Sequence, residues 1–285
     1  MIEKITLNNT EENSSISTED AAKMFNETVV DLDKHLKRPP LAISIGMNNR
    51  GYPQKFATLG NISMIMGEEK SRKSFVKSLL EAGTIGGSAN FKNATDIIGH
   101  LGDKMIISID SEQAEYDVWM NGNRVQKMVN APTDNYRMLM FREKTTEERV
   151  RMLDWLFTES PYKDNLGLVV LDGYVDFIND FNNQHECKDF IAKLMKYSSE
   201  SNCHITGILH VNPKSDKARG HLGSMLQQKC ETVALVESNG SDFSTVKCHR
   251  IRGAMQFETF TVRIDEDYLP YISNDVIEPS AASYV

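Results

Sequence analysis

The sequence contains little that would suit a membrane or secreted protein. It has no apolar run long enough to cross a bilayer, and its start, MIEKITLNNTEENSS, is polar and acidic, without the apolar core of a secretion signal. Cysteine is scarce, and the four residues, Cys187, Cys203, Cys230 and Cys248, stand far apart without the close pairs that zinc sites use. We therefore expect a cytoplasmic protein with reduced thiols and no membrane partner.

Positive charge is also in the minority. The chain has 32 Lys and Arg residues against 40 Asp and Glu residues, which gives a formal net charge of −8 at pH 7. This balance argues against a protein that covers nucleic acid with its whole surface, although it leaves room for a local basic track. No internal repeat is visible, and 285 residues are enough for one large domain, with or without a small appendage.

The two ends of the chain differ in composition from its middle. Residues 1–18 are rich in Asn, Glu and Ser and are expected to be disordered, and residues 273–285 are expected to form a flexible tail. Between them, residues 41–272 are expected to form the main domain.

A separate helix is predicted before the main domain, at residues 19–40. Ser17 or Thr18 can cap it, acidic residues follow in its first turn, and the proline pair after Arg38 ends it. Its apolar stripe consists of Phe25, Val29, Leu32 and Leu36. Such a helix packs on its own domain or serves as an oligomerisation arm.

From residue 41 the pattern alternates between strands and helices, which predicts an α/β fold with a mostly parallel central sheet flanked by helices. The expected strands are 41–46, 55–59, 61–67, 104–110, 136–141, 166–172 and 204–210, and the expected helices lie near 73–82, 113–128, 145–159 and 184–200. After residue 230, the stretches 231–237, 243–250 and 257–264 follow one another with short turns, which predicts a C-terminal antiparallel extension.

One missing glycine marks the most informative stretch. GEEKSRKS, Gly67–Ser74, fits the phosphate-loop pattern G-x-x-x-x-G-K-[ST], except that Arg72 takes the place of the second glycine. The stretch lies between a predicted strand and a predicted helix, where backbone N–H groups and the helix dipole favour an anion. Arg72 would cost backbone freedom and add a cation beside the phosphates.

In a working phosphate loop, Lys73 would reach the β- and γ-phosphates of a nucleotide and the Ser74 hydroxyl would ligate Mg²⁺. The residues that we assign to nucleotide binding are Gly67, Glu68, Glu69, Lys70, Ser71, Arg72, Lys73, Ser74 and Phe75. No guanine-selective N-K-x-D segment is present, which favours ATP as the nucleotide.

Carboxylates follow two of the predicted strands. Asp172 ends the apolar run LGLVVLD, where a carboxylate can hold the water shell of Mg²⁺ opposite the phosphate loop. Glu112 comes just after MIISID and could accept the proton of an attacking water, with Asp110 and Glu115 as alternatives. Solvated loop acids are common, so this pattern gains weight from the phosphate loop before it.

A histidine and a basic loop follow a later strand. His210 ends HITGILH, where an imidazole could sense the γ-phosphate, although a histidine at a strand end is more often only hydrogen-bonded. The next loop carries Lys214, Lys217 and Arg219 among turn-forming residues and could follow a phosphate backbone. An ordinary solvated surface loop would have the same composition.

The order of these features resembles the RecA/DnaB-type ATPase superfamily. The phosphate loop is followed by DSEQ at 110–113, LDG at 171–173, His210, ARGHLGS at 218–224 and QQK at 227–229. The resemblance covers roughly residues 41–265 and is greatest to the small single-domain branch of plasmid RepA-type hexameric replicative helicases, whose relatives are encoded on phages and mobile elements beside primases. Some of those relatives also carry a K-S-R-K-[ST] loop, so Arg72 is a trait of the branch in this interpretation.

This resemblance implies a RecA-like P-loop NTPase fold and a role for each matching residue. Lys73 and Ser74 bind phosphate and Mg²⁺, Asp172 supports the metal, and Glu112 is the catalytic base. His210 is implied to be the sensor that couples the γ-phosphate to the DNA-facing loop. Superfamily members complete the site with a cation from a neighbouring subunit, for which the candidates are Lys229, Arg250 and Arg252.

Three functions are compatible with these features. The leading hypothesis is a Mg²⁺-dependent ATPase and DNA helicase that forms a hexamer or filament on single-stranded DNA. It would act in replication of a phage or mobile element, with a primase as a further partner. A recombinase-like or regulatory DNA-binding ATPase without unwinding activity is the second. The third is a non-catalytic nucleotide-binding assembly module, favoured by Arg72 and disfavoured by the joint presence of Lys73, Ser74, Glu112 and Asp172.

Overall fold

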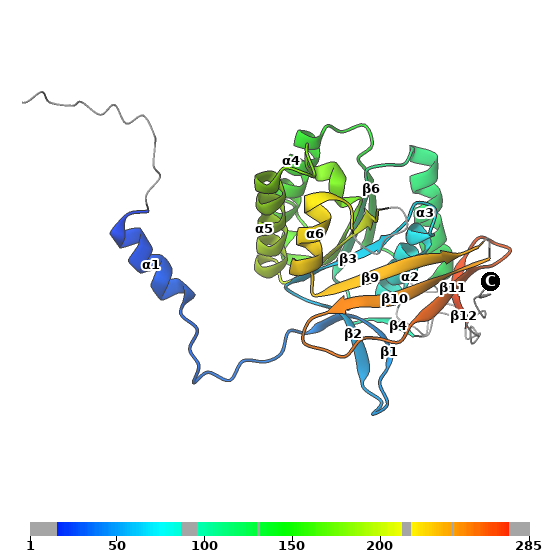
Figure 1. Ribbon diagram of the computed structural model, residues 1–285, viewed down its shortest axis with the longest axis horizontal. Helices are drawn as coiled ribbons and strands as arrows, with labels where there is room; N and C mark the ends of the chain where they lie inside the picture. The colour runs from blue at the N-terminus through cyan, green and yellow to red at the C-terminus, as the bar shows by residue number, and fades with distance from the viewer. Residues whose placement is uncertain (1–15, 87–95, 130–131, 213–217, 241, 274–285) are drawn as a thin grey trace, which may run out of the picture. The chain divides into compact units, whose positions relative to one another are not determined.

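A computed structural model describes residues 16–86, 96–129, 132–212, 218–240 and 242–273 (Figure 1). Most of the expected disordered start (1–18) and of the expected flexible tail (273–285) lies outside these residues. The chain divides into two units, Met1–Arg38 and Pro39–Val285. Within the described ranges, none of the helices is long and apolar enough to cross a membrane.

The helix of the first unit, α1 (Thr18–Thr28), is shorter than predicted. Ser17 caps it, because its hydroxyl accepts the backbone N–H of Asp20 at 3.0 Å. The prediction that the helix continues to Arg38 was wrong, since Val29 is already extended and Asp31 accepts the N–H of Asp33 at 3.0 Å in a local turn. No residue of α1 is buried.

The second unit is built on a nine-stranded sheet with the order β12-β11-β10-β9-β3-β8-β7-β5-β6. These strands are β3 (Asn61–Gly67), β5 (Met105–Asp110), β6 (Tyr136–Met140), β7 (Leu166–Asp172), β8 (His204–His210), β9 (Thr232–Asn239), β10 (Phe243–Ile251), β11 (Phe260–Ile264) and β12 (Pro270–Ser273). The strands from β9 to β6 are parallel, and β10, β11 and β12 are antiparallel additions. The predicted α/β class with an antiparallel extension is therefore confirmed, except that β9 belongs to the parallel part.

A small separate sheet contains β1 (Leu41–Met47), β2 (Pro53–Thr58) and β4 (Ile97–Gly99), all antiparallel. The prediction that residues 41–59 join the parallel sheet was wrong. The link between β1 and β2 is a tight turn in which Asn48 accepts the N–H groups of Arg50 and Tyr52 at 2.9 and 3.0 Å. A turn of this length joins antiparallel strands, whereas parallel strands need a long crossover.

Helices cover both faces of the large sheet (Figure 1). They are α2 (Lys73–Gly86), α3 (Glu115–Met128), α4 (Thr146–Thr158), α5 (Gln184–Glu200) and α6 (Gly220–Lys229), with short 3₁₀ helices η2 (Lys163–Asn165) and η3 (Tyr174–Phe177). One apolar cluster joins α4, α5 and α6 to residues such as Val169 of β7, and the other joins α2, α3 and the small sheet to residues such as Leu168. This alternation follows the period of two of a strand buried on both faces.

The strand register brings the expected site residues to one edge of the sheet. Gly67 at the end of β3 is paired with His210 at the end of β8, and Asp110 at the end of β5 is paired with Asp172 at the end of β7. In open α/β sheets, ligands bind outside the carboxyl ends of the parallel strands.

Candidate nucleotide-binding site

The loop between β3 and α2 keeps a glycine-like backbone at its arginine. Arg72 has φ +68° and Lys70 has φ +59°, both in the left-handed region. Gly67 is required for a different reason, because a Cβ there would lie 2.4 Å from the main-chain oxygen of Val236. The loop thus forms a tight turn against β9 although its second glycine is absent.

Lys73 is enclosed by this loop. Its side chain is largely buried, and its Nζ donates to the main-chain oxygens of Gly67 and Glu68 at 3.0 and 2.6 Å. Burial lowers the pKa of Lys73 to about 8, against the opposing effect of nearby carboxylates led by Asp172. The ammonium is therefore weakly stabilised by the protein alone, as suits a group that meets an anionic ligand.

The N-terminus of α2 is suited to an anion as well. The first turns of α1, α3, α4 and α5 carry acidic residues, whereas the first turns of α2 and α6 carry none. Its backbone N–H groups and dipole can therefore interact with an external negative charge. Ser74 lies in this first turn, where a hydroxyl beside the phosphates can ligate Mg²⁺.

A cavity of about 320 Å³ lies between the loop and the strand ends. Its lining residues are Lys70, Arg72, Lys73, Ser74, Phe75, Glu112, Asp172, Ile208 and His210. The structure thus brings together the ammonium, the hydroxyl, both strand-end acids and the histidine that the sequence singled out. The donor set fits a triphosphate with Mg²⁺, with Ser74 and Asp172 as the residues that would hold the metal directly or through water.

Glu112 and His210 face each other across this cavity. The Oε1 atom of Glu112 lies 3.7 Å from Nε2 of His210, and the interaction with this imidazole is the main cause that lowers the pKa of Glu112. Within the described chain, the buried Nδ1 of His210 has no hydrogen-bond partner. A carboxylate held ionised beside a phosphate site can accept a proton from water.

The two alternatives to Glu112 lie elsewhere. Asp110 is fully buried, and its Oδ1 accepts the N–H groups of Glu112 and Gln113 at 3.1 and 2.9 Å. It therefore shapes the turn that presents Glu112. Glu115 lines a different cavity, between α3 and β6.

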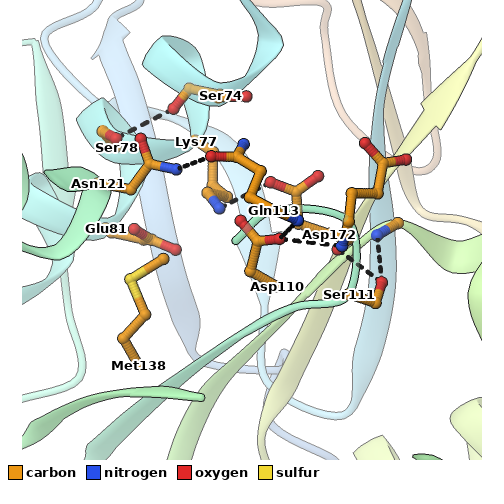
Figure 2. A network of polar contacts seen from close by, with 12 residues as sticks. Ser74, Lys77, Ser78, Glu81, Asp110, Ser111, Gln113, Asn121, Met138 and Asp172 are labelled. Atoms are coloured by element: carbon orange, nitrogen blue, oxygen red, sulfur yellow. Dashed lines mark hydrogen bonds and ion pairs between the residues drawn. The ribbon is translucent and has the colours of Figure 1, made fainter. Parts of the chain in front are cut away.

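Lys77 belongs to this site but was missed in the sequence. Its Nζ lies 2.7 Å from Oδ2 of Asp172, and both side chains are buried (Figure 2). Burial alone would lower the pKa of Lys77, but Asp172, Glu81 and Asp110 together raise it above its ordinary value. The available signal was a lysine four residues after Lys73, in the apolar part of α2.

The side chain of Arg72, a lining residue of the cavity, is also bonded to the turn between β9 and β10. Its guanidinium donates to the main-chain oxygens of Gly240 and Phe243 at 3.2 and 3.0 Å and to the Ser244 hydroxyl at 3.0 Å. Both terminal nitrogens are therefore engaged by the turn between β9 and β10, while Arg72 still lines the cavity.

The predicted basic loop is described only in part. Lys214 and Lys217 lie outside the described residues. Arg219 is exposed, its N–H donates to the main-chain oxygen of His210 at 3.0 Å, and its guanidinium lies 5.4 Å from the ring centroid of Phe181. The loop therefore ends in direct contact with the histidine of the cavity.

The three cations proposed to act on a neighbouring subunit do not line the cavity of their own chain. Arg250 is paired with Val233 at the start of β9, and Lys229 ends α6 just before that strand. Arg252 donates to the main-chain oxygens of Gln228 and Lys229 at 3.2 and 2.9 Å. All three lie toward the amino end of the parallel strands, the edge opposite the phosphate loop.

Comparison with known proteins supports the fold. No protein-family description matches the sequence, and no curated protein does. A solved structure described as the crystal structure of the RadB recombinase matches with a TM-score of 0.50 and 16% identity, over 75% of this chain and 91% of that chain. With the sheet order, this likeness defines a RecA-like fold.

Proposed function

We propose that the protein is a Mg²⁺-dependent ATPase of the RecA/DnaB type that couples ATP hydrolysis to binding of single-stranded DNA and to translocation or unwinding. The observation that carries the proposal is the single cavity lined by Lys73, Ser74, Glu112, Asp172 and His210. These five side chains come from four separate segments, and their convergence on one cavity is not required by the packing of the core.

Each residue has a physical role in this proposal. Lys73 exchanges its bonds to the loop carbonyls for the β- and γ-phosphates, and the first N–H groups of α2 bind the same anion. Bound Mg²⁺ neutralises charge on the phosphates. Glu112 orients the attacking water and accepts its proton, while Ser74 and Asp172 hold the metal shell.

A path from the cavity to DNA is available through His210. Its imidazole faces Glu112, and its main-chain oxygen accepts the N–H of Arg219. A change at the γ-phosphate that moves His210 would therefore move the end of the basic loop, which contains Lys214 and Lys217. Basic loops of this kind contact the phosphate backbone without reading its sequence.

The proposal includes a homo-oligomer, a hexameric ring or a filament, in which Lys229, Arg250 or Arg252 of one subunit approaches the cavity of the next. A helicase of a phage or mobile element that works beside a primase would fit the sequence resemblance. A DNA-binding ATPase without unwinding activity is the second candidate, and it is favoured by the likeness to a structure described as a recombinase.

The decisive experiment measures ATP turnover with and without single-stranded DNA, together with the particle mass by light scattering. Lys73→Ala should abolish turnover, whereas Lys188→Ala, on the exposed face of α5, should retain it. Normal turnover by Lys73→Ala would refute the assignment of the loop. A strand-displacement assay separates the two candidates, since a DNA-stimulated ATPase that displaces no strand is the second one.

A further inference from the structure

A buried lysine lies directly behind the candidate metal position. Lys77 is one helical turn beyond Lys73, and its Nζ contacts Oδ2 of Asp172 at 2.7 Å, with side-chain exposures of 1% and 7% (Figure 2). Lys77 is not among the lining residues of the nucleotide cavity, whereas Asp172 is. The pair therefore forms the wall of the cavity, with the carboxylate in front and the ammonium behind.

This contact divides the two oxygens of Asp172. Oδ2 is committed to Lys77 and α2, which leaves Oδ1 as the oxygen available to the cavity. A carboxylate that is held at one oxygen cannot rotate freely, and charge-assisted hydrogen bonds of this kind are short and directional. Asp172 is thus fixed before any ligand arrives.

Two buried carboxyl groups besides Asp172, those of Glu81 and Asp110, act electrostatically on Lys77. Glu81 lies one turn further along α2 and accepts the hydroxyl of Tyr136 at 3.1 Å, and the buried Oδ2 of Asp110 has no hydrogen-bond partner in the described chain. Both carboxylates, with Asp172, create a negative potential at Lys77, and this potential raises the pKa of its ammonium above the ordinary value. The single ammonium of Lys77 therefore interacts electrostatically with three buried carboxyl groups.

We propose that Lys77 is a positioning residue for the metal-dependent step: its ammonium fixes the Asp172 carboxylate so that one oxygen faces the Mg²⁺ shell, and takes the place of a second cation behind that shell. The inference rests on the proposed function.

A merely structural role is the competing explanation, since a buried ion pair between α2 and β7 also ties the helix to the sheet. Removing one partner of such a pair leaves an uncompensated buried charge and strongly lowers stability. A purely structural loss would lower stability without changing the response to Mg²⁺. The test must therefore separate metal dependence from folding.

The experiment compares wild type, Lys77→Met and Lys193→Met by three measurements: unfolding temperature, affinity for a fluorescent ATP analogue in EDTA, and turnover against Mg²⁺ concentration. Partners behind a metal ligand typically contribute 10- to 100-fold to metal affinity or activity, so Lys77→Met should raise the half-activating Mg²⁺ concentration by about tenfold or more. Affinity in EDTA should be unchanged. Lys193→Met removes an ion pair with Asp154 between α5 and α4. It should change neither the half-activating Mg²⁺ concentration nor the affinity in EDTA.

Two further variants keep the test decisive if Lys77→Met does not fold. Asp172→Asn and the double variant Lys77→Met/Asp172→Asn lack the uncompensated carboxylate. If Lys77 acts through Asp172, the double variant should respond to Mg²⁺ as Asp172→Asn does. Two results would overturn this inference and leave the proposed function intact. One is a weaker response to Mg²⁺ in the double variant than in Asp172→Asn, and the other is a wild-type response to Mg²⁺ in folded Lys77→Met. A wild-type protein without ATP turnover overturns the proposed function and this inference with it.

Discussion

The guanidinium of Arg72 donates to the main-chain oxygen of Phe243 at 3.0 Å, so the residue that replaces a glycine in the phosphate loop is bonded to the turn between β9 and β10. Arg72 keeps a left-handed backbone, φ +68°, which disfavours any residue with a Cβ. Hydrogen bonds from the same side chain to Gly240 and Ser244 offset this cost. The substitution is therefore built into the loop, and β10 takes part in holding its shape.

A pair of substitutions at Arg72 separates backbone strain from side-chain bonding. Arg72→Ala loses the bonds to the β9–β10 turn and keeps the strain, whereas Arg72→Gly loses the bonds and relieves the strain. Glycine should therefore be more stable than alanine here by about 1 kcal/mol, which is about 2–4 °C in unfolding temperature for a domain of this size. Calorimetry on the two variants measures the difference. Equal unfolding temperatures would mean that the left-handed conformation costs nothing.

Much of the parallel sheet and most of the cavity could be predicted from the sequence. The strands β3, β7 and β8 have the predicted bounds, because strands buried on both faces are mainly apolar runs, which here end at Gly67, Asp172 and His210. Their carboxyl ends then lie at one edge, so Asp172 and His210 were expected there together. This argument needs no knowledge of side-chain packing.

Features that depend on distant partners could not be predicted. Lys77 contacts a carboxylate 95 residues away, and Arg72 contacts a turn 168–172 residues away. Residues 41–59 have the apolar pattern of strands in either sheet, and only the turn at Asn48 and the pairing with β4 place them in the small one. The end of α1 depended on a local side-chain bond at Asp31, which helical periodicity does not report.

The burial of Lys73 should make stability depend on pH. Its pKa is about 8 in the folded protein against 10.5 as the ordinary value, so between these values the unfolded chain binds a proton that the folded protein has released. Stability attributable to Lys73 therefore rises from pH 8 to 10.5, and burying the charged form destabilises the protein below pH 8. Each pKa unit corresponds to about 1.4 kcal/mol, so the full change is on the order of 3–4 kcal/mol.

Lys73→Met tests this sign directly. The free energy of unfolding of the variant minus that of wild type should be largest below pH 8 and should fall as the pH rises toward 10.5. Denaturant unfolding at several pH values measures it, and Lys188→Met serves as the control for loss of an exposed lysine. A difference that stays constant over this range would show that Lys73 keeps its proton in the folded protein.

Glu112 and Glu115 lie only three residues apart in the sequence but line different cavities. Glu112→Gln should keep affinity for ATP, since the phosphate loop is intact, and should lower turnover by roughly 10²–10⁴-fold, the usual contribution of a general base. Glu115→Gln is the matched control and should turn over ATP at the wild-type rate. Single-turnover hydrolysis with a nucleotide-binding assay separates the two effects. Loss of turnover in Glu115→Gln alone would move the base to α3.

Mixing two inactive variants tests whether a cation acts across subunits. Arg250 lies toward the amino end of the parallel strands and cannot reach the cavity at the carboxyl ends in its own chain, so Arg250→Ala should lose turnover only by harming a neighbour's site. Lys73→Ala lacks a working phosphate loop but keeps Arg250. In a head-to-tail assembly mixed at equal amounts, about one quarter of interfaces join an intact loop to an intact arginine, and turnover should return in proportion.

Arg252→Ala is the informative comparison. The guanidinium of Arg252 donates to the last carbonyls of α6, so its loss should lower the stability of the protein itself. If the Lys73→Ala and Arg250→Ala mixture stays inactive while each protein folds and assembles, Arg250 does not supply the cation, and Lys229 becomes the next residue to test in the same way.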